Sequence, residues 1–90
     1  MKDVIQKTVT AGKTETFNMK LQRSKFLVKN FTEGKIKVFL GDNDTYSLID
    51  AGCFQCVYNN IEPGKLLPDA TKQVNVTADD TGIVEVSSID

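Results

Sequence analysis

Residues 26–40, with the sequence FLVKNFTEGKIKVFL, contain the pattern that decides the fold class. Two apolar-rich runs flank a short turn that ends at Gly34. The second run alternates outward and inward positions in the order Lys35, Ile36, Lys37, Val38, Phe39 and Leu40. A period of two is typical of strands that bury one face against a core, and a glycine at the turn favours a tight connection. This segment therefore predicts one β-hairpin.

The same alternation recurs along nearly the whole chain. Turn signals separate the alternating runs at intervals of about eight to twelve residues, which is typical of a sandwich or a small barrel. The predicted strands cover about 3–10, 15–21, 25–31, 35–40, 46–50, 53–59, 72–78 and 83–89. No stretch has a helical period. We therefore predict a single all-β domain over residues 1–90, a small antiparallel β-sandwich of about seven or eight strands, either immunoglobulin-like or jelly-roll-like.

The composition is that of an ordinary globular domain. The chain has 90 residues, of which 40% are hydrophobic and 26% charged. No apolar run approaches the roughly 20 residues that span a bilayer, and the N-terminal residues lack the apolar core of a signal peptide. The two cysteines are compatible with a reducing compartment. We therefore expect a cytoplasmic protein that does not contact membranes.

The net charge of −1 conceals an uneven distribution of charge along the chain. Residues 1–40 contain nine Lys or Arg and three acids, whereas residues 41–90 contain two Lys and nine acids. This asymmetry can produce a basic face that meets nucleic acid, or the acidic face of a second copy. Alternatively, strands from the two halves interleave and their charges neutralise one another locally. Nucleic acid is not expected as a partner, because Arg23 is the sole arginine and no basic–aromatic recognition motif is present.

Residues that could support catalysis or bind a metal are scarce. Histidine is absent, which removes the usual general base and the commonest metal ligand. In a strand, Cys53 and Cys56 would point to opposite faces about 10 Å apart, too far for a disulfide, and zinc sites need about four ligands. We expect that the two cysteines have no redox or metal-binding role, and that Cys56 packs beside Phe54 and Tyr58. The sequence predicts no enzyme activity, no cofactor and no metal.

An acidic turn follows the predicted strand 35–40. Asp42, Asn43 and Asp44 could ligate calcium, but Ser47 and Cys53 stand where an EF-hand loop needs glycine and glutamate. Side chains that hydrogen-bond to their own turn explain this segment better.

Two features are candidates for partner binding. If Ile36, Val38 and Leu40 face the core, Phe39 lies on the outer face beside Lys35 and Lys37. There it either packs in a second layer or contacts a partner. Leu66 and Leu67 lie in the long loop at 59–71, which contains both prolines. They either contact a partner or, as we expect, fold back as a plug over one end of the core.

Three stretches resemble small structural proteins of tailed bacteriophages. They are residues 26–38 (FLVKNFTEGKIKV), 49–54 (IDAGCF) and 81–86 (TGIVEV). The likeness runs from Ser24 to Gln55 and again near the end, and consists of strands and turns without a signature site. It implies a virion or virion-assembly component of the head-associated, decoration or connector type, located in the virion or in the cytoplasm of the bacterial host during assembly. It carries over no catalytic residue.

The resemblance and the residues together favour a protein that acts by docking. The expected partners are other virion subunits, or further copies of the chain in a homo-oligomer, bound through the Lys35, Lys37 and Phe39 face or through the 59–71 loop. One alternative is a small carbohydrate- or protein-binding β-sandwich module. The other is an enzyme that uses carboxylates such as Asp42, Asp44 or Asp50.

Overall fold

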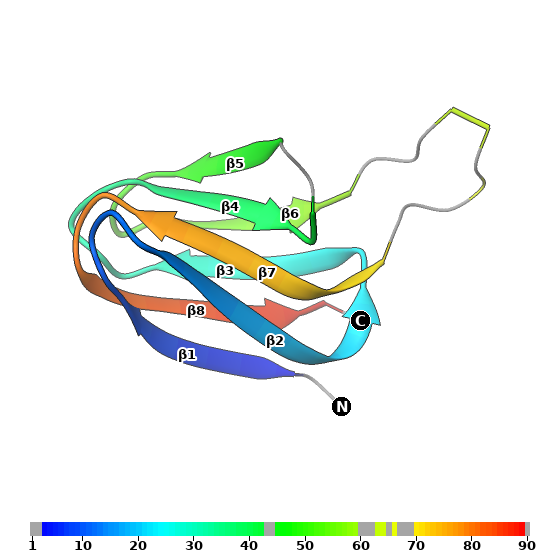
Figure 1. Ribbon diagram of the computed structural model, residues 1–90, viewed down its shortest axis with the longest axis horizontal. Helices are drawn as coiled ribbons and strands as arrows, with labels where there is room; N and C mark the ends of the chain where they lie inside the picture. The colour runs from blue at the N-terminus through cyan, green and yellow to red at the C-terminus, as the bar shows by residue number, and fades with distance from the viewer. Residues whose placement is uncertain (1–2, 43–44, 60–62, 65, 67–69, 90) are drawn as a thin grey trace.

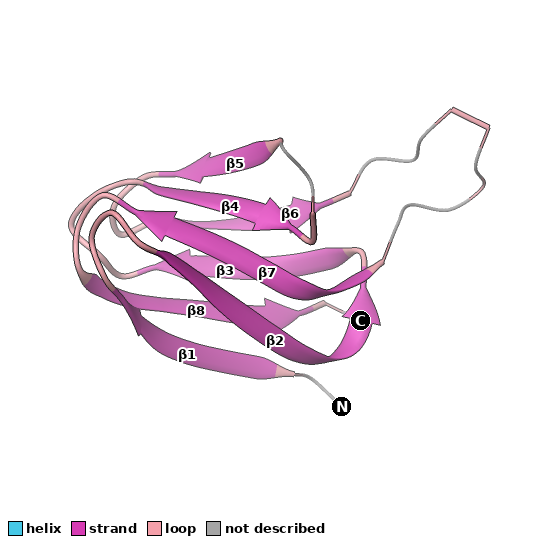
Figure 2. Ribbon diagram, viewed as in Figure 1, coloured by secondary structure: helices cyan, strands magenta, loops and turns pink. Residues whose placement is uncertain are grey.

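The computed structural model describes residues 3–42, 45–59, 63–64, 66 and 70–89, and its regular structure consists of eight strands (Figure 1, Figure 2). The strands are β1 (Val4–Val9), β2 (Thr14–Arg23), β3 (Lys25–Asn30), β4 (Ile36–Leu40), β5 (Tyr46–Ile49), β6 (Phe54–Tyr58), β7 (Thr71–Ala78) and β8 (Gly82–Ser88). All eight predicted strands are confirmed, with ends that differ by at most two residues. The described residues include no helix that is long and apolar enough to cross a membrane.

The strands form two four-stranded antiparallel sheets with the orders β1-β8-β3-β6 and β2-β7-β4-β5. The first strand therefore pairs with the last, β2 with β7, β3 with β6, and β4 with β5. Such nested pairing describes one long folded ribbon wound around a core, which is the jelly-roll topology. In an immunoglobulin sandwich the first two strands share a sheet, whereas β1 and β2 lie in different sheets here. The prediction of a β-sandwich is confirmed, and the strand order is jelly-roll-like.

The prediction that residues 26–40 form a hairpin is wrong. β3 belongs to one sheet and β4 to the other, so the intervening turn crosses between the sheets as an arch (Figure 1). Both strands have a buried apolar face because both face the same core from opposite sheets. The alternation identifies a strand with one buried face, but it does not identify the strand that pairs with it.

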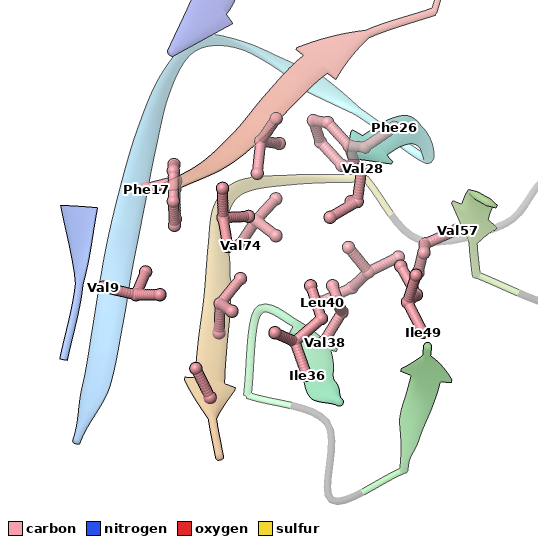
Figure 3. Close-up of a cluster of buried hydrophobic side chains, with 14 of the residues drawn as sticks. Val9, Phe17, Phe26, Val28, Ile36, Val38, Leu40, Ile49, Val57 and Val74 are labelled. Atoms are coloured by element: carbon pink, nitrogen blue, oxygen red, sulfur yellow. The ribbon is translucent and has the colours of Figure 1, made fainter. Parts of the chain in front are cut away.

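The core lies between the inward faces of the two sheets (Figure 3). Every buried hydrophobic residue that the structure describes belongs to a strand: Val9, Phe17, Met19, Phe26, Val28, Ile36, Val38, Leu40, Ile49, Val57, Val74, Val76, Ala78, Val84 and Val86. Each large side chain removed from water stabilises the fold by about 1.5–3 kcal/mol before conformational entropy is counted. The two sheets are therefore held together mainly by Val, Ile and Phe side chains.

The basic and acidic halves of the chain interleave. In both sheets a strand from residues 1–40 alternates with a strand from residues 41–90. Ion pairs between described residues connect the halves: Lys29 Nζ lies 3.5 Å from Glu85 Oε2, and Lys35 Nζ lies 3.9 Å from Asp50 Oδ1. Of the two interpretations of the charge distribution, local neutralisation is the one that this strand order supports.

Candidate docking surface

Exposed hydrophobic side chains lie on β5 and β6, the two strands at one side of the sandwich, and they point outward from the opposite faces of the two sheets. These two strands are edges of different sheets, and they contact each other (Figure 1). They contribute Tyr46, Leu48, Phe54 and Tyr58, all of which are exposed. The other exposed large hydrophobic residues that the structure describes are spread over other elements: Val4, Leu21, Phe31, Leu66 and Ile83. We call the surface formed by residues 46–49 and 54–58 the β5–β6 side.

Phe39 points outward, as predicted, and packs against an aromatic neighbour. The register places Phe39 opposite Tyr46, and their ring centroids are 5.4 Å apart with a tilt of 58°. Lys37 Nζ lies 4.9 Å from the centre of the Tyr46 ring, within the range of a cation–π contact. Phe39 is half-buried and Tyr46 is exposed, so the pair forms an aromatic patch beside the β5 edge.

The three residues proposed on this face are only partly brought together. Lys37 and Phe39 share the aromatic patch, whereas Lys35 lies just before β4 and pairs with Asp50. Both partners of that ion pair are well exposed, so it contributes little to stability. Sequence reasoning missed Tyr46 as a member of this patch. The alternation had placed Tyr46 in a strand, but only the β4–β5 register shows that it faces Phe39.

The predicted plug over the core is wrong for Leu66. Its side chain is 94% exposed, and the described core is filled by strand residues alone. Because the strands already supply enough apolar side chains to close the interior, Leu66 is not needed there. Leu67 lies outside the described residues, as do Asn43 and Asp44 of the acidic turn.

The outer face of β6 is aromatic and uncharged. Phe54 is 70% exposed, Tyr58 is 57% exposed, and Cys56 lies between them on the same face. The predicted alternation of Cys56 with Phe54 and Tyr58 is therefore confirmed, but the three side chains are exposed rather than packed. Both Cys53 and Cys56 are free thiols at exposed positions.

One side of the β6 backbone pairs with no strand among the residues that the structure describes. Asn30 N donates to Cys53 O at 2.9 Å and Asn59 N donates to Ser24 O at 3.0 Å, at the two ends of the β3–β6 ladder. In an antiparallel ladder the hydrogen-bonded pairs alternate with non-hydrogen-bonded pairs. Gln55 and Val57 consequently direct their N–H and C=O groups toward β3. The corresponding groups of the three outward-facing residues point away from the sheet, at its free edge: Phe54, Cys56 and Tyr58.

The opposite side of the sandwich, formed by β1 and β2, is covered by charged side chains. Lys7 Nζ donates to Thr16 O at 2.8 Å and lies 3.6 Å from Glu15 Oε1. The Asp3 carboxylate accepts a hydrogen bond from Lys20 N. Lysine and other charges at an edge discourage strand addition, because a new strand would bury them. β5 and β6 themselves carry no charged residue, although Lys37 of β4 lies over the Tyr46 ring.

An open hollow and the acidic residues of the chain bear on catalysis and metal binding. An open hollow of about 350 Å³ is lined by Leu40, Gly41, Asp42, Asn59, Ala70, Thr71 and Gln73. Asp42 follows β4 and Asp50 follows β5, so antiparallel pairing places these carboxylates at opposite ends of the β4–β5 hairpin. In the part of the chain that the structure describes, no three His, Cys, Asp or Glu side chains lie together where a metal ion could bind.

The exposed aromatic edge is therefore the feature of this molecule with the clearest chemistry for recognition. No family model, curated protein or solved structure matches this chain.

Proposed function

We propose that this chain is a non-enzymatic structural or assembly protein of a bacteriophage virion, of the head-associated, decoration or connector type. It acts by docking onto other virion subunits through the β5–β6 side. The observation that carries this proposal is the coincidence of two uncharged edge strands with exposed aromatic side chains on one side of the sandwich.

Interface chemistry supports docking at this side. Protein interfaces are enriched in Tyr and Phe and depleted in charged residues at their centres, which describes Tyr46, Phe54 and Tyr58 on β5 and β6. An edge strand also offers backbone hydrogen bonds to a partner that brings a strand of its own. An aromatic patch beside an open edge can therefore supply both apolar contact and directional bonding.

The virion assignment has two supports of a more general kind. One is the resemblance of residues 26–38, 49–54 and 81–86 to small phage structural proteins. The other is the jelly-roll strand order, an architecture used by viral capsid domains and also by lectins and cupins. Fold-level analogy alone does not determine function, so the docking surface remains the main support.

The proposal is tested by following the protein into particles. In a host that produces the phage, the chain should co-purify with particles at a fixed copy number, measured by quantitative mass spectrometry. Phe54→Lys should reduce that copy number, because it places a charge on the exposed edge. Val4→Lys is the matched control, since Val4 is also exposed on an edge strand but lies on the opposite side. Absence from particles contradicts the virion role, and equal loss with both variants contradicts the assigned surface.

A carbohydrate-binding module is the second candidate. It is favoured by Phe54 and Tyr58, two exposed aromatic side chains on the same face of one strand. Aromatic rings at such spacing can stack on sugar rings. This role predicts retardation in polysaccharide affinity gels that is lost in Phe54→Ala and Tyr58→Ala, with no incorporation into particles.

A further inference from the structure

We infer that β6 pairs with β6 of a second copy of this chain, antiparallel about a two-fold axis that passes beside Cys56. The inference rests on the docking function proposed above and names one partner of the same surface. It joins the sheets β1-β8-β3-β6 of two molecules into one continuous sheet.

The free backbone groups of β6 suit this pairing. Phe54, Cys56 and Tyr58 direct their N–H and C=O groups to the free edge, as the hydrogen bonds at the ends of the β3–β6 ladder require. When a two-fold axis places Cys56 opposite Cys56 of the second copy, Phe54 falls opposite Tyr58. All three residues then form hydrogen-bonded pairs, each of which exchanges two bonds.

The side chains match in the same register. Phe54 of each copy meets Tyr58 of the other on the outer face of the joined sheet, so the arrangement creates two aromatic cross-strand pairs. Such pairs stabilise antiparallel strands, and an aromatic side chain reaches its cross-strand partner readily. The two Cys56 side chains lie opposite each other at the axis, between the two aromatic pairs.

The charges distinguish β6 from the other edges. A two-fold axis brings the same strand of two copies together, so a strand whose sole charge is a lysine brings two lysines near each other, and a strand with several charges must bury or match them all. β1 carries Lys7, and β2 carries several charged side chains, whereas β6 carries none. β5 is also uncharged, but it is shorter and presents just Tyr46 and Leu48 outward. β6 is therefore the edge best suited to meet a copy of itself.

The exposed area limits the size of the contact. Phe54 and Tyr58 are 70% and 57% exposed. Since an aromatic side chain carries about 150–250 Å² of surface, the four rings of a dimer expose on the order of 500 Å² before pairing, and cross-strand contact on the outer face buries part of it. With the backbone edges added, the contact falls near the lower end of specific interfaces, below about 1,200 Å². We therefore expect a dimer that dissociates on dilution.

Cross-linking tests the register, because the chain provides two matched thiols. Cys53→Ser leaves Cys56 as the sole thiol, and Cys56→Ser leaves Cys53. In the inferred dimer the two Cys56 residues lie opposite each other, with Cα atoms about 5.5 Å apart. The two Cys53 residues are displaced by six positions, or about 20 Å. A short bismaleimide should therefore cross-link Cys53→Ser into a dimer and leave Cys56→Ser monomeric on a denaturing gel.

A pair of introduced opposite charges tests the same register without cysteine chemistry. Phe54→Lys and Tyr58→Glu as single substitutions should each weaken the dimer at least about tenfold in sedimentation, because a charge replaces an aromatic contact. The double variant Phe54→Lys/Tyr58→Glu brings the introduced lysine of each copy opposite the introduced glutamate of the other, and should restore dimerisation. Val4→Lys, on the far edge, should leave the dimer unchanged. Unfolding curves confirm that each variant is folded.

Several results overturn the inference. They are a monomer at every concentration, equal cross-linking of both single-thiol variants, or no restoration in the double variant. A mass that grows beyond the dimer indicates head-to-tail pairing with another edge and also overturns it. If the chain stays monomeric yet enters particles, the inferred dimer is wrong and the docking function stands. If the chain dimerises but is absent from particles, the virion role is wrong and the inferred dimer stands.

Discussion

The side-chain oxygen of Asn30 accepts hydrogen bonds from both the backbone N–H and the hydroxyl of Thr32, at 2.9 and 2.7 Å, and both residues are buried. The amide nitrogen of Asn30 donates to the carbonyl oxygens of Gly34, Ile49 and Asp50. One side chain thus joins the arch between β3 and β4 to the end of β5. It fixes how the chain passes from one sheet to the other, and so how β5 is placed beside β6.

Asn30→Ala should lower the free energy of unfolding by about 3 kcal/mol, since it leaves several buried polar groups without partners. Asn18→Ala is the control, because Asn18 is exposed on β2 and its loss should change stability by less than about 0.5 kcal/mol. Urea unfolding measures both. Equal effects would show that the Asn30 network does not stabilise the arch.

Gly82→Ala should destabilise the fold by about 2 kcal/mol through overpacking. A Cβ at position 82 would lie 2.9 Å from both Cα and Cγ2 of Thr32, and one of these atoms is backbone that cannot rotate away. Thr32→Ser in the same chain removes Cγ2 and should recover part of the loss. A Gly82→Ala protein with unchanged thermal midpoint would contradict the close packing of β8 against the arch.

Two phenylalanines should give opposite results. Phe26 is completely buried, so Phe26→Ala should cost about 3–5 kcal/mol of stability. Phe54 is 70% exposed, so Phe54→Ala should leave the unfolding transition nearly unchanged while weakening docking. Unfolding and sedimentation on the same samples separate the two effects. A large loss of stability in Phe54→Ala would mean that this ring belongs to the core.

Lys7→Ala should convert the protected side of the sandwich into an open edge. It removes the hydrogen bond to Thr16 O and uncovers Phe17, whose ring centre lies 5.5 Å from Lys7 Nζ. We expect added association by light scattering, because the edge of β2 becomes available to a new strand. Lys13→Ala, which makes the same charge change outside any strand, should not associate. If the two variants associate to the same extent, Lys7 does not protect this edge from strand addition.

Local sequence patterns were sufficient to locate the strands but not to pair them. The alternation of Ile36, Val38 and Leu40 correctly indicates one buried face and an outward Phe39. It carries no information about whether β3 lies beside β4 or across the core from it, because both arrangements bury the same residues. The pairing of β1 with β8 depends on contacts between the two ends of the chain, which no short window contains.

The candidate site was predictable only in part for the same reason. Lys37 and Phe39 were identified from their own strand, whereas Tyr46 joins them through the β4–β5 register. The edge of β6 could not be recognised as free before its position in the sheet was known, since an identical sequence inside a sheet has both edges paired. Leu66 was assigned to the core because small domains need apolar side chains, but strand residues alone supply them.

Amide hydrogen exchange along β6 tests the central claim most directly, because adjacent residues provide an internal control. The N–H groups of Gln55 and Val57 point toward β3, whereas those of Phe54, Cys56 and Tyr58 point to the free edge. We predict that the three outward amides exchange rapidly in dilute protein and become protected at high concentration, while the two inward amides stay protected throughout. Outward amides that exchange equally fast in dilute and concentrated, associated protein would contradict docking through β6.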